Sequence, residues 1–208
     1  LTAQINPHFL YNSLSIINWM AIRSRQKEIS RVTLSLSMFY RTALSKGQDM
    51  VTVDNCIQNI RAYLDIQLVM HDNDFQVIWV IDPEVKGDIV PKLLIQPVVE
   101  NALEHGLDMK EEGEKILKLI FVQDGTDVLL AVEDNGPGIC DEMKPHIFEM
   151  FYTGKNTIAD SHRSLGLGLA LCRSIIEVHN GKLVLEDNTP HGCIFSFTLP
   201  LSEVTLNE

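Results

Sequence analysis

The chain has 208 residues, of which 45% are hydrophobic and 22% charged, a composition typical of a globular protein with a substantial core. Its formal net charge of −11 argues against a basic surface that neutralises phosphates, so we expect no nucleic-acid binding. The four cysteines are scattered without a Cys-x-x-Cys pair, which indicates a reducing compartment and no structural zinc.

The first predicted element is a helix over about the first 24 residues, which contains the run Gln-Ile-Asn-Pro-His-Phe-Leu-Tyr-Asn at 4–12. Helical spacing places His8 and Asn12 on one face, and this face is mostly polar, so we expect His8 to be in water. Two apolar stripes flank that face, and one partner helix could not cover both. His8 is our candidate for the residue that carries the chemistry. A capped helix with an ordinary surface histidine is the alternative for this run by itself.

A second helix is predicted over 28–46, with apolar residues at heptad-like spacing and Gly47 at its end. Two helices with apolar surface on more than one face cannot bury it alone, so we predict a dimeric four-helix bundle built with a second copy. Thr52 can cap a third helix. We place the domain boundary near Gly47, which gives a helical domain at 1–47 and a second domain at 48–208.

From Phe75 the pattern becomes a mixture of strands and helices. Strands are predicted at 75–81, 116–122, 128–133, 182–186 and 193–199, and helices at 91–105 and 167–179. A hairpin joins the second and third strands across Asp124-Gly125. Because the strands occur in hairpins rather than in strict alternation with helices, we predict an α+β chain. Its second domain is then an α/β sandwich, with a mixed sheet covered by helices on one face.

The first motif of this second domain is the run Gln-Pro-Val-Val-Glu-Asn-Ala-Leu-Glu-His-Gly at 96–106. On a helix its apolar residues face the core, whereas Glu100, Asn101, Glu104 and His105 project to the other side. The amide oxygen of Asn101 could ligate a hard cation, and magnesium held by one side chain plus phosphates would fit. A solvated polar face is the alternative for this stretch taken alone.

The second motif, Glu-Asp-Asn-Gly-Pro-Gly-Ile at 133–139, is a strand that runs into a turn with Gly136 and Gly138 around a proline. Such a turn brings the backbone close to a flat ligand. Asp134 could accept a hydrogen bond from an amino group such as that of adenine. A tight surface turn is the alternative, since Asn-Gly and Pro-Gly are common turn formers.

The third motif, Ser-Leu-Gly-Leu-Gly-Leu-Ala-Leu at 164–171, places Gly166 and Gly168 where a helix opens with free N–H groups that can hold phosphates. It is not a dinucleotide fingerprint, because the third glycine of that pattern is missing. The long segment between the two glycine motifs has little regular pattern and contains Lys155 and Arg163. We interpret it as a mobile lid over a nucleotide.

Together, the order and spacing of these motifs resemble the nucleotide-binding domain of the GHKL ATPase and histidine-kinase superfamily. Residues 100–102 are similar to its N box, 134–138 to its G1 box, 148–151 to its F box and 166–168 to its G2 box. The run at 7–12 resembles the phosphoacceptor box of sensor histidine kinases of the LytS and YesM type. The resemblance covers nearly the whole chain.

This resemblance implies a two-component sensor histidine kinase core that uses ATP and Mg²⁺. His8 would accept the γ-phosphoryl group and pass it to an aspartate on a response regulator receiver domain. Asn101 would ligate magnesium, and Asp134 would read adenine. From its place one turn beyond His8, Asn12 could also orient a water that dephosphorylates the regulator, with structural capping as the alternative. The other nucleotide-binding candidates are His105, Gly136, Gly138, Lys155, Arg163, Gly166 and Gly168.

Four positions depart from the family's pattern. Glu104 stands where related kinases often carry lysine, and a carboxylate there repels a triphosphate unless it turns away or joins the metal shell. Cys193 replaces a usual threonine whose hydroxyl helps to bind adenine. Phe9 follows His8 where many kinases have an acidic residue, which leaves the base unassigned. Pro97 occupies the position where GHKL hydrolases carry a glutamate that activates water.

Two other functions stay open. A degenerate GHKL scaffold that binds nucleotide as a dimer without transferring phosphate is favoured by Glu104 and Cys193. A protein-serine kinase of the anti-sigma type would leave the histidine run and the helical hairpin unexplained. The resemblance further implies a homodimer in the cytoplasm. We expect membrane attachment only through upstream segments, because no stretch approaches the roughly 20 apolar residues of a membrane span.

Overall fold

The computed structural model describes residues 7–44, 49–92, 94–152 and 166–200. These residues form two compact units, which we describe separately. The first holds helices α1 (Pro7–Arg23), α2 (Lys27–Leu44) and nearly all of α3 (Val53–Met70). The second holds β1 (Met50–Thr52) and the described chain from Phe75 onward.

The boundary predicted near Gly47 lies outside the described residues, and α3 belongs to the helical unit rather than to the second one. Its grouping has a physical cause. Ser35 of α2 donates a hydrogen bond to Asp65 of α3 over 3.1 Å, and the rings of Phe39 and Tyr63 lie 5.9 Å apart. Helix α3 begins at Val53, directly after Thr52 as predicted.

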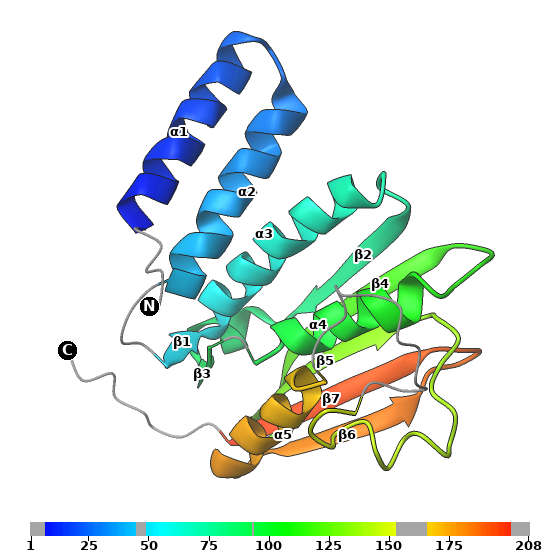
Figure 1. Cartoon of the computed structure of the whole chain (residues 1–208). Helices are drawn as coiled ribbons and strands as arrows, with labels where there is room; N and C mark the ends of the chain where they lie inside the picture. Colours follow the sequence, from blue (N-terminus) through cyan, green and yellow to red (C-terminus); the bar gives the residue numbers. More distant parts are fainter. Residues whose placement is uncertain (1–6, 45–48, 93, 153–165, 201–208) are drawn as a thin grey trace. The chain divides into compact units, whose positions relative to one another are not determined.

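Helices α1 and α2 form the predicted hairpin (Figure 1). Leu14 and Ala21 are buried, but much of the apolar surface of the hairpin is not. The large exposed side chains are Phe9, Ile16, Ile17, Trp19, Met20, Ile22, Ile29, Leu34 and Met38. This hairpin therefore leaves apolar surface uncovered, as the two predicted stripes required.

The second unit is built on a five-stranded mixed sheet in the order β2-β4-β5-β7-β6 (Figure 1). Its strands are β2 (Phe75–Ile81), β4 (Lys115–Asp124), β5 (Asp127–Asp134), β6 (Lys182–Asp187) and β7 (Cys193–Pro200). β2 and β4 pair in parallel, and the other neighbours pair antiparallel. The five predicted strands and the mixed sheet are thus confirmed.

The core of this unit lies between the sheet and helices α4 (Gln96–Asn101) and α5 (Gly168–Val178), which lie over one face of the sheet (Figure 1). Leu117, Leu119 and Phe121 alternate along β4 and are fully buried, which is the period of two that a one-sided sheet requires. On β2, Ile78 and Val80 are 42% and 39% exposed, so this edge strand keeps part of its apolar surface outside the core.

None of the described helices is long and apolar enough to cross a membrane.

The helix predicted over 91–105 is wrong at its start. Pro91 ends a short strand, β3 (Ile89–Pro91), which pairs with β1 opposite Met50. The helix begins at Gln96, so that Pro97 occupies the first turn, where its missing N–H costs no hydrogen bond. Beyond Asn101 the chain continues as a π-helical turn, Ala102–Leu107, a local widening often found at functional sites.

Candidate nucleotide-binding site

A cavity of about 310 Å³ lies in the second unit, between the α4 segment, the end of β5 and the start of α5. Six of the predicted site residues line it together: Asn101, His105, Asp134, Gly138, Gly166 and Gly168. Lys155 and Arg163 fall outside the described residues, together with the rest of residues 153–165 of the predicted lid. The sequence motifs, spread over some 70 positions, therefore converge on one cavity.

Asp134 ends β5 and is only 3% exposed, although it lines this cavity. Its Oδ1 accepts a hydrogen bond from the backbone N–H of Gly136 over 2.9 Å, and the backbone N–H of Cys193 also donates to the carboxylate. Burial raises the pKa of Asp134, while these two bonds and the charge of Lys110 act in the opposite direction. A carboxylate has about four acceptor positions, so two backbone donors leave room for a ligand amino group.

Gly136 does not line the cavity, but its backbone packs against Gly106, which does. A Cβ at Gly136 would lie 2.6 Å from the Cα of Gly106, and a Cβ at Gly106 would lie 2.8 Å from Cγ of Asp134. The π-helical turn and the turn after β5 therefore approach each other backbone to backbone. Only glycine at both positions permits this contact, which holds the Asp134 carboxylate in place.

We expect Gly136→Ala to destabilise the second unit by roughly 1–3 kcal/mol, because its methyl group has no space beside Gly106. The matched control is Gly87→Ala, where an added Cβ meets nothing within 4 Å, so its effect should stay within about 0.5 kcal/mol. Urea unfolding curves measure both. Equal losses in the two variants would show that the close approach is unimportant.

The polar wall of the cavity comes from α4 and the π-helical turn. Glu100, Asn101, Glu104 and His105 all line it. Gln96 donates a hydrogen bond to Glu100 over 2.8 Å. The described residues contain no group of three or more acidic, histidine or cysteine side chains that could hold a metal. The oxygen donors here fit a magnesium ion that shares its coordination with the phosphates of a nucleotide.

Sequence reasoning missed the apolar wall. Ile139, the last residue of the motif at 133–139, lines the cavity together with Met143, Ile147 and Tyr152 of the segment that follows that motif. The spacing of Met143 and Ile147 by four residues was the available signal. Lys144 forms an ion pair with Asp141 of the same segment over 2.6 Å and another with Asp187 at the end of β6 over 2.7 Å.

Cys193 lines the cavity near Asp134, and burial raises the pKa of its thiol to about 12. The thiol is therefore neutral at physiological pH and acts as a small apolar surface. It lacks the hydroxyl that the resemblance led us to expect at this position.

His8 and Asn12 belong to the helical unit, and the predicted shared face is present. His8 is exposed, and the side-chain amide of Asn12 lies 3.3 Å from its Nδ1. Phe9 is 72% exposed. The candidate phosphoacceptor is thus open to solvent on a helix separate from the cavity unit.

Two known families match this chain, one over most of the helical unit and one over most of the second unit. The family "Histidine kinase" matches residues 1–75, and the family "Histidine kinase-, DNA gyrase B-, and HSP90-like ATPase" matches residues 89–203. The chain is 39% identical over 139 residues to the sensor histidine kinase YesM of Bacillus subtilis, and the aligned region covers 67% of this chain and 24% of YesM. It is 30% identical over 203 residues to the sensor protein LytS of Staphylococcus haemolyticus, and the aligned region covers 96% of this chain and 33% of LytS.

Solved structures show the same fold. The catalytic domain of the histidine kinase ThkA superposes with a TM-score of 0.56 at 24% identity, over 73% of this chain and 94% of that domain. The histidine kinase domain from Erythrobacter litoralis EL346 superposes with a TM-score of 0.53 at 16% identity, over 94% of each chain. This chain spans only about a quarter to a third of the curated relatives it matches. It belongs to the histidine kinase-, DNA gyrase B- and HSP90-like ATPase family, as the catalytic core of a sensor histidine kinase.

Proposed function

We propose that this core phosphorylates His8 from ATP and passes the phosphoryl group to an aspartate of a response regulator receiver domain. The observation that carries the proposal is the buried carboxylate of Asp134 on the wall of the cavity. A charged acceptor is kept out of water only where a ligand or the fold uses it, and here one face of it is open to the cavity. The exposed His8 supplies the acceptor nitrogen.

In this proposal each cavity residue has a defined task. Asp134 accepts a hydrogen bond from the amino group of adenine, and Gly138 lets the backbone lie close to the base. Asn101 ligates Mg²⁺ through its amide oxygen. The remaining candidates act on the phosphates, as cations or as backbone donors, and they are His105, Lys155, Arg163, Gly166 and Gly168. Gly136 serves indirectly, by seating Asp134.

The transfer itself is a displacement at phosphorus. A neutral imidazole nitrogen of His8 forms a bond to the γ-phosphorus as the bond to the β–γ bridging oxygen breaks, and ADP leaves. Magnesium, when bound with the nucleotide, neutralises charge on the phosphate oxygens. The protein's part is to position the nucleotide and to exclude water, which the apolar wall of the cavity favours.

The direct test is incubation with γ-labelled ATP and magnesium. We expect label that is lost in acid and retained in alkali, because a phosphorus–nitrogen bond to histidine has that stability. A purified receiver domain of the cognate regulator should then take up the label. Label that survives acid would instead indicate a phosphorylated serine or threonine, as in the anti-sigma type of kinase.

A second candidate function rests on Glu104, an acidic residue that lines the cavity. A carboxylate near a triphosphate is repulsive, and Cys193 supplies no hydroxyl in the same cavity. A scaffold that binds nucleotide without transferring phosphate would explain both. Calorimetry that shows nucleotide binding, together with no label on His8, would favour this function.

We further propose that the helical unit forms a homodimer. The apolar side chains exposed on α1 and α2 are what two copies would bury against each other in a four-helix bundle. In this proposal the phosphoacceptor region is the helical unit, with α3 as part of it, and the ATP-binding region is the second unit, which holds β1 and the chain from Phe75 onward. As in the predicted organisation, this core would act in the cytoplasm and reach the membrane only through other segments of a longer protein.

Asp134→Asn should weaken ATP binding by roughly 10- to 100-fold, because asparagine puts an N–H₂ donor where the amino group of adenine needs an acceptor. Calorimetry across pH gives a second readout. Since burial raises the pKa of Asp134, the parent should lose ATP affinity as pH falls toward that pKa, at a higher pH than an ordinary aspartate would cause. The variant has no such group and should show a flat profile.

The contribution of Asp134 to the free energy of unfolding of the nucleotide-free protein should fall as pH rises, whereas its contribution to ATP affinity should grow. A carboxyl whose pKa is raised by folding contributes stability below its unfolded pKa, and that contribution is lost as pH rises through the folded pKa. Asp134→Asn should remove this pH dependence. An unchanged profile for both binding and unfolding would exclude Asp134 as the group that reads the base.

Asn12→Ala should leave labelling of His8 intact but slow dephosphorylation of the phosphorylated regulator by roughly tenfold or more, because a positioned amide no longer orients the attacking water. Ser15→Ala is the control, since Ser15 is exposed on the same line of the helix. Decay of labelled regulator is the measurement. Equal decay rates with the two variants would leave Asn12 a structural role only.

A further inference from the structure

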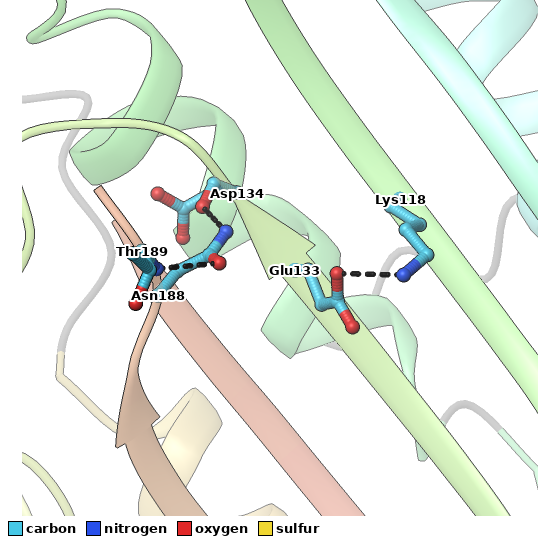
Figure 2. Close-up of polar contacts among 5 residues, drawn as sticks. All are labelled: Lys118, Glu133, Asp134, Asn188 and Thr189. Atoms are coloured by element: carbon cyan, nitrogen blue, oxygen red, sulfur yellow. Dashed lines mark hydrogen bonds and ion pairs between the residues drawn. The ribbon is translucent and has the colours of Figure 1, made fainter. Parts of the chain in front are cut away.

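Asn188 lies beside Asp134 although the two are 54 positions apart in the sequence (Figure 2). Its side-chain Nδ2 donates to the backbone carbonyl of Asp134 over 2.8 Å, and its Oδ1 accepts from the backbone N–H of Thr189 over 2.8 Å. One partner requires a donor and the other requires an acceptor. The two bonds therefore fix which way the amide faces.

The sheet explains why this carbonyl needs a side chain as its partner. β7 lies between β5 and β6, and its pairing with β5 ends at Glu133 opposite Ile194. Asp134 is the next residue, which pairs with Leu117 of β4 but lies beyond the last position of β5 that pairs with β7. Asn188 follows β6 directly, and its amide reaches across the start of β7 to supply the hydrogen bond that the ladder no longer provides.

The chain from Asn188 to Cys193 contacts Asp134 in two further ways. The backbone N–H of Cys193 donates to the Asp134 carboxylate, and Gly192 approaches so closely that a Cβ there would overlap the Asp134 carbonyl oxygen. The N–H of Asn188 donates to the carbonyl of Gly192 over 3.0 Å, which closes the turn. Both the backbone and the side chain of Asp134 are thus held by one turn.

We propose that Asn188 is a positioning residue for recognition of the nucleotide base, an inference that rests on the proposed adenine-nucleotide function. It does not line the cavity, and it acts through Asp134. By fixing the backbone of Asp134 it fixes the carboxylate, which accepts from the exocyclic amino group of adenine. Guanine presents a carbonyl oxygen at the corresponding ring position, and a rigidly held carboxylate repels it.

The consequence is specific to the base and leaves the phosphates unaffected. Asn188→Ala should lower the affinity for magnesium ADP by roughly tenfold, and lower the preference for ADP over GDP, because the backbone that carries the carboxylate loses the hydrogen bond from Asn188. Affinity for magnesium tripolyphosphate, which has no base, should be unchanged. Calorimetry with the three ligands on the full chain gives this comparison.

Two further variants separate positioning from general loosening. Asn188→Asp keeps the size of the side chain and the acceptor for Thr189, but it cannot donate to Asp134, so it should also lose the preference for ADP. Gln123→Ala is the matched control. Gln123 donates to the carbonyl of Gly125 over 3.1 Å, in the turn at the other end of β5, and its loss should leave all three affinities as in the parent.

An unchanged ratio of ADP to GDP affinity in Asn188→Ala and Asn188→Asp would overturn the inference. Loss of tripolyphosphate binding in step with ADP would also overturn it, because that pattern indicates general loosening. A parent protein that binds tripolyphosphate but shows no preference for ADP would refute the proposed adenine site itself. Melting temperatures of the variants without ligand show whether each one is folded.

Discussion

Replacement of His8 by glutamine is expected to abolish the acid-labile label completely. The nitrogen of a glutamine amide shares its lone pair with the carbonyl group, so it cannot attack phosphorus as an imidazole nitrogen does. ATP affinity should remain that of the parent, because His8 belongs to the helical unit and the cavity is formed by the other unit. Labelling with γ-labelled ATP and calorimetry with ATP test the two halves of this expectation.

The matched control is His71→Gln, since His71 is the other histidine of the helical unit. It should label as the parent does. His146→Gln tests an exposed histidine of the second unit, which pairs with Glu149. Full labelling of His8→Gln, or loss of labelling in either control, would show that the acceptor is elsewhere.

Much of this fold followed from local pattern. The period-two runs at 75–81 and 193–199 predicted strands that the structure places within one residue, because each has one face in the core. The hairpin across Asp124-Gly125 is present, with β4 and β5 paired antiparallel. Convergence of the three motifs on one cavity was implied by the resemblance, since spacing along the chain does not determine distance in space.

What the sequence could not predict depends on contacts between distant segments. The α4 helix begins at Gln96 and not at Pro91, because Pro91 belongs to β3 and pairs with Met50 of β1. The π-helical turn after Asn101 contains Gly106, whose backbone contacts Gly136 from a turn 30 positions further along the chain. No sequence motif indicates the role that we propose for Asn188, since its partner Asp134 lies on a strand 54 positions away.

We also expect this core to hydrolyse ATP only slowly by direct attack of water, because of Pro97. Pro97 lines the cavity in the first turn of α4, four residues and so about one helical turn before Asn101. In GHKL hydrolases that position carries the glutamate that activates the attacking water. Proline has no group that can accept a proton, and loss of a positioned base typically costs a factor of about 10² to 10⁴ in rate.

We expect Glu100 to be a less effective base than a glutamate at position 97 would be. It is adjacent to Asn101, so about 100° of helix rotation separates the two side chains, and its carboxylate accepts a hydrogen bond from Gln96 over 2.8 Å. Hydrolysis by direct attack of water should therefore be slow. The γ-phosphoryl group of bound ATP then persists until the nitrogen of His8 attacks it.

Phosphate release at saturating ATP, without a regulator, should be slow in the parent and slower still in His8→Gln, because turnover runs through phosphohistidine. Pro97→Glu should raise release, and the gain should persist in the Pro97→Glu/His8→Gln double variant, since a glutamate at this position restores a base for water. Pro97→Gln is the matched control, with the same length of side chain and no base, and it should not raise release. Fast release from the His8→Gln variant alone would make this core an ATPase and refute the role assigned to Pro97.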